Sequence, residues 1–344
     1  MSGSGDLWQP DLFVSGTEGY HTFRIPAIVV STQGTLLAFC EGRKYSGADD
    51  GEIDLVLKRS LDNGVTWQQM QLIWHDGDNT IGNPCPVVDQ DTGVIWLPFC
   101  RNNDRVFVTA SSDDGASWST PVEITLAVKL PPWGFYATGP GHGIQLSTGR
   151  LLIPCDHGTE TEWPFGVLHS HVFYSDDHGS SWQLGGIVGQ EGTSECEAVQ
   201  TMDGSVYLNI RPYPAKQSRA YTWSDDGGET WSEVQFDESL LAPSCQGSVV
   251  RFTDERRHDK NRVLFSNPAS TERERLTVRL SYDECQTWTA DKVLHGGPAA
   301  YSDLAVAPDM TICCLYENGQ EHPYERITLA QFNLEWLTDD ADHL

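Results

Sequence analysis

Three arginines, Arg24, Arg211 and Arg279, adjoin apolar runs in widely separated parts of the chain. A guanidinium group binds a carboxylate through paired, charge-assisted hydrogen bonds. If the apolar runs are strands that end on the same side of a fold, the three side chains form a converging cationic cluster. The alternative is that each arginine makes a separate salt bridge on the surface of an acidic chain.

Acidic and phenolic side chains offer the remaining chemistry. Asp49 lies in the flexible, acidic stretch 46–54. A mobile carboxylic acid beside a pocket can act as a general acid, although most acidic loops are simply solvated. Glu317 follows an apolar run and could either orient an arginine or remain a surface charge. Glu195 and Tyr301 are unremarkable in their local sequence, and most tyrosines are packing groups.

Several other chemistries are not supported by the motifs of the chain. The eleven histidines and nine cysteines show neither HExxH nor CxxC spacing, which are common metal-binding patterns. The GxSxG, GxxxxGK and strand-linked GxGxxG motifs are also missing. The glycine-rich stretch 139–143 does not open a predicted helix, so phosphate binding is not expected. The sequence therefore predicts a site that works without a metal or cofactor.

A short phrase, Ser-x-Asp-x-Gly-x-Thr/Ser-Trp, occurs five times along the chain. Its copies are residues 60–67, 111–118, 175–182, 224–231 and 281–288. Ser and Asp side chains bond to nearby backbone and Gly permits a positive φ, so the phrase predicts a tight turn that Trp anchors. Strand-forming residues precede each copy, which indicates a β-hairpin. The fifth copy has Cys285 instead of Gly, which predicts a differently shaped turn.

A second hairpin pattern lies out of phase with the first. Six apolar runs each meet a turn and continue as a second run, at residues 26–40, 86–100, 143–155, 198–210, 248–266 and 304–316. Both patterns together predict an all-β, six-bladed β-propeller with four antiparallel strands per blade. Segment 326–332 would complete the last blade, and residues 11–14 could close the ring. The second runs end on polar residues that are expected to share one channel mouth: Glu41, Arg43, Arg101, Asp156, Arg211, Asn267 and Glu317.

Composition constrains the class of protein. The repeats extend through nearly all of the chain, so we expect a single domain over residues 1–344. The net charge of −27 argues against nucleic acid or anionic membranes as partners. Neither a membrane span nor a signal peptide is predicted. The nine cysteines are expected to be buried free thiols, which favours a cytoplasmic location, whereas a signal removed before residue 1 would indicate a secreted or lysosome-like protein.

With these features in view, the chain resembles the exo-α-sialidases (neuraminidases) that carry Asp-box repeats. In wording it is similar to the lysosomal-type sialidase and its bacterial relatives, over residues 18–334. Residues 23–26, Phe-Arg-Ile-Pro, match the family's Tyr/Phe-Arg-Ile-Pro motif, and the five turn phrases match its Asp-boxes. Further family-like segments are residues 34–39, 83–86, 139–141 and 301–302.

The resemblance implies a binding site for the carboxylate of sialic acid. Arg24, Arg211 and Arg279 match the arginine triad that holds this carboxylate. Glu317 matches the acid that orients the first arginine, and Arg43 matches a further arginine near the catalytic acid. These arginines would also explain how an acidic chain admits an anionic substrate, because a local cationic pocket can outweigh a distant, screened field.

The resemblance also implies the catalytic groups. Tyr301 matches the nucleophile, and Glu195 matches the carboxylate that takes its proton. Asp49 matches the general acid and base, with Asp50 and Asp54 as rivals. A neutral phenol suits this substrate because an anionic nucleophile would be repelled by the carboxylate on the anomeric carbon.

The expected function is that of a retaining exo-α-sialidase that releases terminal α-linked sialic acid from oligosaccharides, glycoproteins or glycolipids. Trans-sialidases and intramolecular trans-sialidases share these motifs, and a non-catalytic sialoglycan-binding propeller is a further alternative. Contacts to the N-acetyl and glycerol arms are not fixed by any motif. Aromatic candidates for them, which could equally be packing groups, lie in segments predicted to be irregular: Trp133, Phe135, Tyr136, Trp163 and Phe165.

Overall fold

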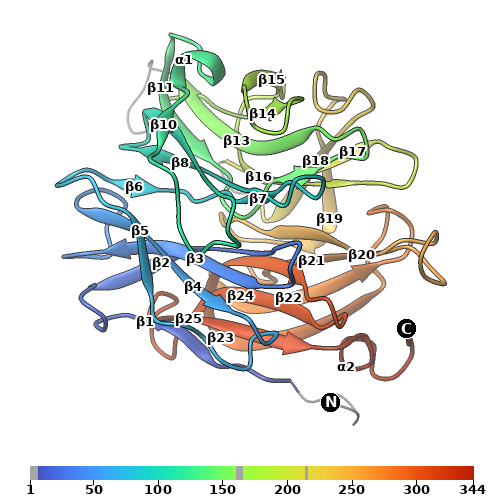
Figure 1. Cartoon of the computed structure of the whole chain (residues 1–344). Coiled ribbons are helices and arrows are strands. Elements are labelled where there is room, and N and C mark those ends of the chain that lie inside the picture. Colours follow the sequence, from blue (N-terminus) through green and yellow to red (C-terminus); the bar gives the residue numbers. More distant parts are fainter. Residues whose placement is uncertain (1–6, 160–165, 214–215) are drawn as a thin grey trace.

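The computed structural model describes residues 7–159, 166–213 and 216–344, which form an all-β structure with a propeller-like arrangement of sheets (Figure 1). The sheets follow one another around the molecule in chain order, from blue to red. The first (blue) and last (red) strands therefore lie side by side, and β2 packs against β23, β24 and β25.

Four sheets are separate antiparallel blades. The first contains β2 (Thr22–Val30), β3 (Leu36–Arg43), β4 (Ile53–Ser60) and β5 (Gln71–Trp74). The second contains β6 (Ile81–Gly82), β7 (Val87–Val88), β8 (Ile95–Arg101), β9 (Arg105–Ser111) and β10 (Val122–Glu123). The third contains β11 (Trp133–Thr138), β12 (Ile144–Gln145), β13 (Leu151–Thr159), β14 (Leu168–Ser175) and β15 (Gln183–Ile187). The fourth contains β16 (Thr193–Gln200), β17 (Val206–Pro212), β18 (Ser218–Ser224) and β19 (Gln235–Leu241).

The fifth sheet has seven strands. It contains β20 (Ser248–Thr253), β21 (Arg262–Pro268), β22 (Glu274–Ser281), β23 (Ala290–Val306), β24 (Ile312–Asn318), β25 (Arg326–Phe332) and β1 (Asp11–Val14). The described residues thus form five sheets rather than the six separate blades predicted. The reason is β23, whose residues 290–298 pair with β22 while residues 299–306 pair with β24. The chain continues as one extended strand where the sequence predicted a break between blades.

The amino-terminal strand lies at the edge of the seven-stranded sheet, next to segment 326–332. β1 pairs antiparallel with β25, and the backbone of Trp8 bonds to Gln331 beyond it. Two short helices complete the described secondary structure, α1 (Thr125–Val128) and α2 (Leu334–Thr338). No helix among the described residues is long and apolar enough to cross a membrane.

The five turn phrases form the predicted hairpin turns between the third and fourth strands of their blades. In the first, Ser60 Oγ accepts a hydrogen bond from Gly64 N at 2.8 Å, and Asp62 Oδ1 accepts one from Thr66 N at 2.8 Å. The fifth turn has the same bonds, so the prediction that its shape differs is wrong. Cys285 adopts φ 67° and takes the place of the glycine. The Ser and Asp side chains therefore define this turn more strongly than glycine does.

The apolar core lies between neighbouring sheets, and the tryptophans of the turn phrases help to join them. The ring of Trp118 lies 5.7 Å from that of Phe39 in the preceding blade. Trp231 Nε1 donates a hydrogen bond to Gly186 O of the preceding blade at 3.0 Å. All nine cysteines lie among the described residues and are buried free thiols, as predicted.

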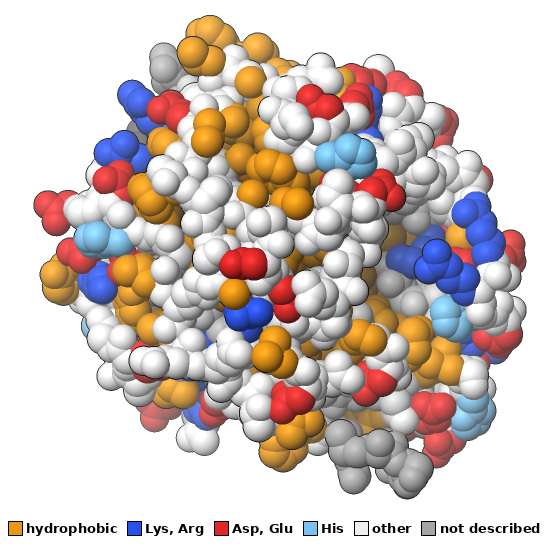
Figure 2. All heavy atoms as spheres, in the orientation of Figure 1, with side chains coloured by type: hydrophobic (Ala, Val, Ile, Leu, Met, Phe, Trp, Pro, Cys, Tyr) orange, Lys and Arg blue, Asp and Glu red, His pale blue; other side chains and the backbone are white. Residues whose placement is uncertain are grey.

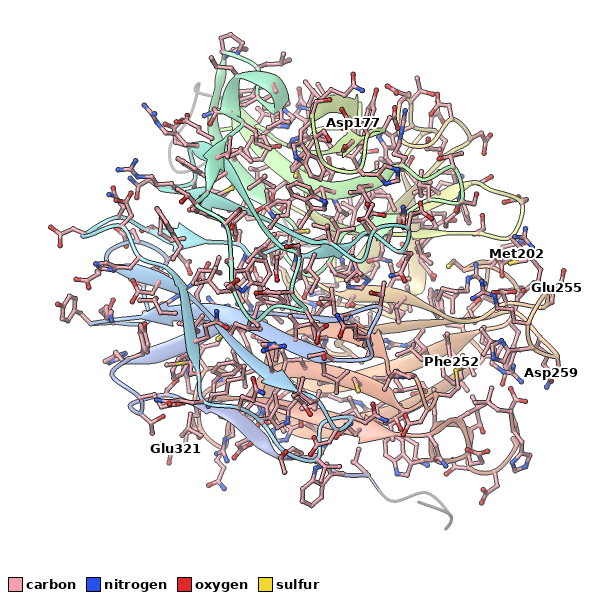
Figure 3. The ribbon with its side chains drawn as sticks, viewed as in Figure 1. Asp177, Met202, Phe252, Glu255, Asp259 and Glu321 are labelled. Carbon is pink, nitrogen blue, oxygen red and sulfur yellow. The ribbon has the colours of Figure 1, made fainter. Side chains whose placement is uncertain are left out.

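The two ends of the blades differ. Figure 3 shows Glu321, between β24 and β25, on the left, and Met202, Glu255 and Asp259 on the right, in turns between first and second strands. Basic side chains gather on the right in Figure 2, the side on which the 254–261 turn lies. The loop of Asp49, between β3 and β4, belongs to the other end.

Candidate active site

Three predicted site residues occupy irregular positions in strands β2, β16 and β23. A β-bulge disturbs the regular alternation of side chains and can direct one toward a site. Arg24, Glu195 and Tyr301 lie at or within such irregularities. The shifts in register fall between Arg24 and Ala27, between Thr193 and Cys196, and between Ala299 and Ser302.

Arg24, in the first sheet, is held by Glu317, in the seven-stranded sheet. Their side chains form two bonds, Nε to Oε1 at 3.0 Å and Nη2 to Oε2 at 3.1 Å, and both residues are buried. Glu317 also accepts hydrogen bonds from the backbone N–H of Ile25 at 2.9 Å and of Tyr301 at 3.2 Å. Ile25 has φ 58°, an unusual value for a β-branched residue. Glu317 thus fixes both the arginine and the backbone around it.

Tyr301 lies at the centre of the contacts. Its hydroxyl donates a hydrogen bond to Oε1 of Glu195. Arg211 Nη1 donates to Glu195 Oε2 at 2.7 Å and to the Tyr301 hydroxyl oxygen at 3.1 Å. The guanidinium carbon of Arg24 lies 5.2 Å from the centre of the Tyr301 ring. A phenol, an acceptor for its proton and two guanidinium groups are therefore in direct contact.

The surroundings of Tyr301 favour its neutral form. Burial raises the pKa of Tyr301 well above its usual value, and the Glu195 carboxylate raises it further, while nearby guanidinium groups oppose both effects. A neutral phenol with a carboxylate acceptor can become a nucleophile when its proton moves to that acceptor.

Asp49 lies above this group on the loop between β3 and β4. Arg43 Nη1 donates to the carbonyl oxygens of Gly47 and Ala48, at 2.7 and 2.8 Å, and to Asp49 Oδ1 at 2.8 Å. Arg24 Nη1 also contacts Asp49 Oδ1, at 3.3 Å. The Asp49 side chain is 82% exposed, whereas the two arginines are buried. Arg43 thus fixes the conformation of the loop and holds the Asp49 carboxylate at the solvent-exposed side of the site.

The two rival acids are placed differently. Asp54 is buried in β4, where it accepts hydrogen bonds from the Tyr20 hydroxyl at 2.7 Å and contacts His75 Nδ1 at 2.7 Å. These contacts give Asp54 a structural role. Asp50 is exposed, and it forms no ion pair among the described residues. Asp49 is the acid that the structure brings to the arginines.

Some of the strand-end residues predicted to share one mouth are brought together, and two, Arg101 and Asn267, are not. Asn267 bonds to Leu241 O and to Arg279. Arg43 Nη2 pairs with Glu41 at 2.7 Å beside the loop of Asp49. Asp156 is buried near Glu195 and Arg211, and burial raises its pKa well above the usual value. Arg101 instead pairs with Asp76, at 2.9 Å, away from these contacts.

The structure brings Arg273 to Tyr301 in place of the predicted Arg279. The guanidinium carbon of Arg273 lies 5.3 Å from the centre of the Tyr301 ring, and its Nη2 donates to Ser244 O at 3.0 Å. Arg279 instead donates to Asn267 Oδ1 at 2.6 Å. Arg273 directly precedes β22. Arg279 lies within β22, about 20 Å from Arg273 along the strand at a rise of about 3.3 Å per residue. The assignment of Arg279 to the cluster is therefore corrected to Arg273.

The chain has extended similarity to known proteins. Residues 34–314 match the model of the BNR repeat-like domain. A sialidase of Micromonospora viridifaciens is 33% identical over 96% of this chain, which spans 54% of that protein. An exo-alpha-sialidase of Aspergillus fumigatus is 31% identical over 99% of this chain and 90% of that protein. The chain belongs to the sialidase family of glycoside hydrolases.

Solved sialidases have the same fold. The Hadza microbial sialidase Hz136 superimposes with a TM-score of 0.86 at 27% identity, covering 96% of this chain and 69% of that one. A leech intramolecular trans-sialidase superimposes with a TM-score of 0.82 at 19% identity, covering 97% of this chain and 71% of that one. At 19% identity the likeness to the leech protein shows the fold alone.

Sequence reasoning missed three residues of this sialidase site. Arg273, Tyr324 and Ser244 have no motif of their own. Arg24 lies over the Tyr324 ring at 3.9 Å, and Ser244 Oγ accepts hydrogen bonds from Arg211 Nε and Nη2 at 3.1 and 2.9 Å. Two of them share a signal, because Arg273 and Tyr324, like Asp49, each lie shortly before the strand that follows one of the predicted apolar hairpins, at β22, β25 and β4. Position within the repeat would therefore have identified both.

The described aromatic candidates for substrate contacts lie in a strand, β11, and not in an irregular segment. Trp133 and Tyr136 are buried in the core, and Trp133 stacks on His157 with ring centres 3.5 Å apart. These two are packing groups. Phe135 is partly buried in the same strand. Trp163 and Phe165 lie outside the described residues.

A buried ionic group lies below Tyr301 and Glu195. His142 Nδ1 is 2.7 Å from Asp303 and 3.5 Å from Glu197. Burial lowers the pKa of His142, but the two carboxylates outweigh it and raise the pKa to about 9. Ser248 Oγ and Ile28 N donate further hydrogen bonds to these carboxylates. The group therefore joins first strands of different blades beneath the site.

Proposed function

We propose that this protein is a retaining exo-α-sialidase that hydrolyses terminal α-linked sialic acid from glycoconjugates. The observation that carries the proposal is the side chain of Tyr301, whose hydroxyl bonds to Glu195 and Arg211 and whose ring lies beside Arg24 and Arg273. In this proposal Tyr301 attacks the anomeric carbon and Glu195 takes the phenol proton. Water then hydrolyses the glycosyl-enzyme intermediate, so the product keeps the configuration of the substrate.

The three arginines would hold the substrate carboxylate. Arg24 and Arg211 are already paired with Glu317 and Glu195, which fix their orientation. Arg273 forms no ion pair within the described part of the chain, and its partners are the Tyr324 hydroxyl and Ser244 O. Its guanidinium charge is therefore available to a carboxylate, and the geometry of the other two arginines is set in advance.

Asp49 would act as general acid and then as general base. In the free site, the surrounding protein displaces some water from Asp49 and so raises its pKa, but the charges of Arg43 and Arg24 outweigh this effect and hold the pKa below the usual value. A substrate carboxylate bound at Arg24 would compensate part of that positive charge and repel the Asp49 carboxylate. Substrate binding would therefore favour the protonated form that donates to the departing oxygen.

This change predicts a difference between two pH profiles. The profile of kcat/KM reports the free enzyme, and that of kcat reports the enzyme–substrate complex. Because Asp49 must be protonated, activity falls as pH rises through its pKa. We expect this alkaline fall at higher pH in kcat than in kcat/KM, by about one unit, which is about 1.4 kcal/mol. Steady-state kinetics on a sialoside with a sugar leaving group will measure both profiles.

Asp49→Asn and Asp50→Asn form the matched pair for this test. Asp49→Asn is expected to lower kcat by about 10²- to 10⁴-fold with a sugar leaving group and far less with an activated aryl group. Asp50→Asn should change neither profile. Identical alkaline limbs in kcat and kcat/KM of the wild type would contradict the proposed effect of the substrate on Asp49.

We also infer that the propeller has six blades. Counting β23 as the last strand of one blade and the first strand of the next divides the seven-stranded sheet in two. In support, β2 contacts β7 and β7 contacts β12. On the other side, β16 contacts β20, β20 contacts β23, and β23 contacts β2. We further propose that residues 1–344 form one catalytic domain that works in the cytoplasm on sialylated oligosaccharides, glycoproteins or glycolipids.

Product analysis tests the proposed reaction against its alternatives. We expect NMR of a reaction on an α-linked sialyllactose to show the α-anomer of free sialic acid before mutarotation. An anhydro product would indicate intramolecular transfer, as the name of the leech protein describes for that enzyme. A sialylated acceptor would indicate transfer between sugars. Binding of the trisaccharide without turnover would favour a glycan-binding propeller and contradict the proposed function.

A further inference from the structure

Arg219, in β18, is a fully buried arginine whose hydrogen-bond partners are neutral. Its Nε donates to Asn209 Oδ1 at 2.8 Å and its Nη1 to Cys245 O at 2.5 Å. Its Nη2 has no hydrogen-bond partner in the described structure. Arg262 is equally buried but pairs with Asp342 at 2.7 Å. Arg219 is thus a buried charge without the direct carboxylate partner that Arg262 has.

Such a charge is costly to bury, so its position calls for an explanation. Burial lowers the pKa of Arg219 to about 10, so the group is still charged at neutral pH. Glu195 and Arg211 are close enough to affect this pKa in opposite directions. The guanidinium charge of Arg219 therefore lies close to the candidate active site.

Each residue of the segment that Arg219 holds, residues 244–246, contacts the site. Ser244 Oγ accepts hydrogen bonds from Arg211, and Ser244 O accepts one from Arg273 at 3.0 Å. Gln246 Oε1 accepts a hydrogen bond from the backbone N–H of Ser302, next to the nucleophile, at 3.1 Å. Cys245 packs in the apolar cluster that contains Tyr301.

We propose that Arg219 is a positioning residue for carboxylate binding, which fixes segment 244–246 and thereby orients Arg211 and Arg273. It also places a positive charge near Arg211. The inference rests on the proposed function, because it assumes that the two arginines bind the carboxylate of sialic acid.

The expected effect falls on binding. Without Arg219 the Cys245 carbonyl loses its donor, and the segment can shift away from both arginines. The substrate carboxylate is held before and during the reaction, so a loss of alignment weakens both states alike and raises KM more than it lowers kcat.

The test compares the same substitution at two equally buried arginines. Arg219→Gln is expected to raise KM for a sialoside, and Kd for free sialic acid, by about 10- to 100-fold with a smaller change in kcat. Arg219→Lys keeps the charge and should recover part of this loss. Arg262→Gln should lower the melting temperature and leave KM unchanged, because Arg262 pairs with Asp342 away from the site.

A double-mutant cycle tests the route through the segment. If Arg219 acts through Ser244, the effects of Arg219→Gln and Ser244→Ala on Kd should be less than additive. If Arg219→Gln does not fold, Arg219→Lys is compared with Arg262→Lys instead. Unchanged KM and Kd in a folded Arg219 variant, or equal changes at both arginines, would overturn the proposal. A wild type that binds sialic acid without hydrolysing sialosides contradicts only the proposed reaction, and the Kd comparison still tests Arg219.

Discussion

Tyr301→Phe is expected to lower kcat/KM for a natural sialoside by about 10³-fold or more. Phenylalanine keeps the ring that Arg24 and Arg273 contact, at 5.2 and 5.3 Å, but removes the oxygen that would attack the anomeric carbon. The substitution should therefore affect catalysis much more than binding. Kd for free sialic acid should change only a few-fold, and the rate of release of sialic acid should show most of the loss.

Tyr316→Phe is the matched control. Tyr316 is buried on the neighbouring strand β24, and its hydroxyl accepts a hydrogen bond from Gln9 at 3.2 Å. Removing that hydroxyl should leave kcat/KM nearly unchanged. A fluorinated sialoside that slows hydrolysis of the intermediate should add its mass to the peptide that contains Tyr301 in the wild type. Full activity of Tyr301→Phe, or a label on Glu195, would assign the nucleophile elsewhere.

The sequence predicts local features well because their determinants are close together in the chain. Each turn phrase depends on a Ser and an Asp within eight residues, and all five turns form. Cys285 shows the limit of a consensus pattern, since a non-glycine residue adopts φ 67° when the flanking side chains define the turn. The strand β23 shows another limit, because a continuous extended strand can serve two blades where the repeat pattern predicts a break.

The site depends on contacts that no local pattern contains. Arg24 and Glu317 are 293 residues apart, and Tyr301 and Glu195 are 106 apart. The family resemblance predicted these residues, and the structure supplies the bulges that direct three of them. The wrong assignment of Arg279 came from the end of an apolar run. β22 continues to Ser281, so the residue that faces the other site loops is the one before the strand.

The contrast between Arg273 and Arg279 gives the second large expected effect. Arg273→Ala should lower kcat/KM for a sialoside by about 10²- to 10³-fold, because a charged partner of the substrate carboxylate is lost. Arg279→Ala should leave KM unchanged in the folded protein. The substitution Arg279→Ala should instead lower the melting temperature, because Arg279 is buried and bonded to Asn267.

Two further comparisons make this contrast decisive. Arg273→Lys keeps the charge but not the paired donors, so it should recover only part of the lost affinity for sialic acid. Arg279→Lys should bind sialic acid like the wild type. Since the two positions lie in the same blade, a general disturbance of that blade would affect binding in both. If Arg279→Ala lost binding while Arg273→Ala kept it, the third arginine of the site would be Arg279, and the position before the third strand would not be the rule that places site residues.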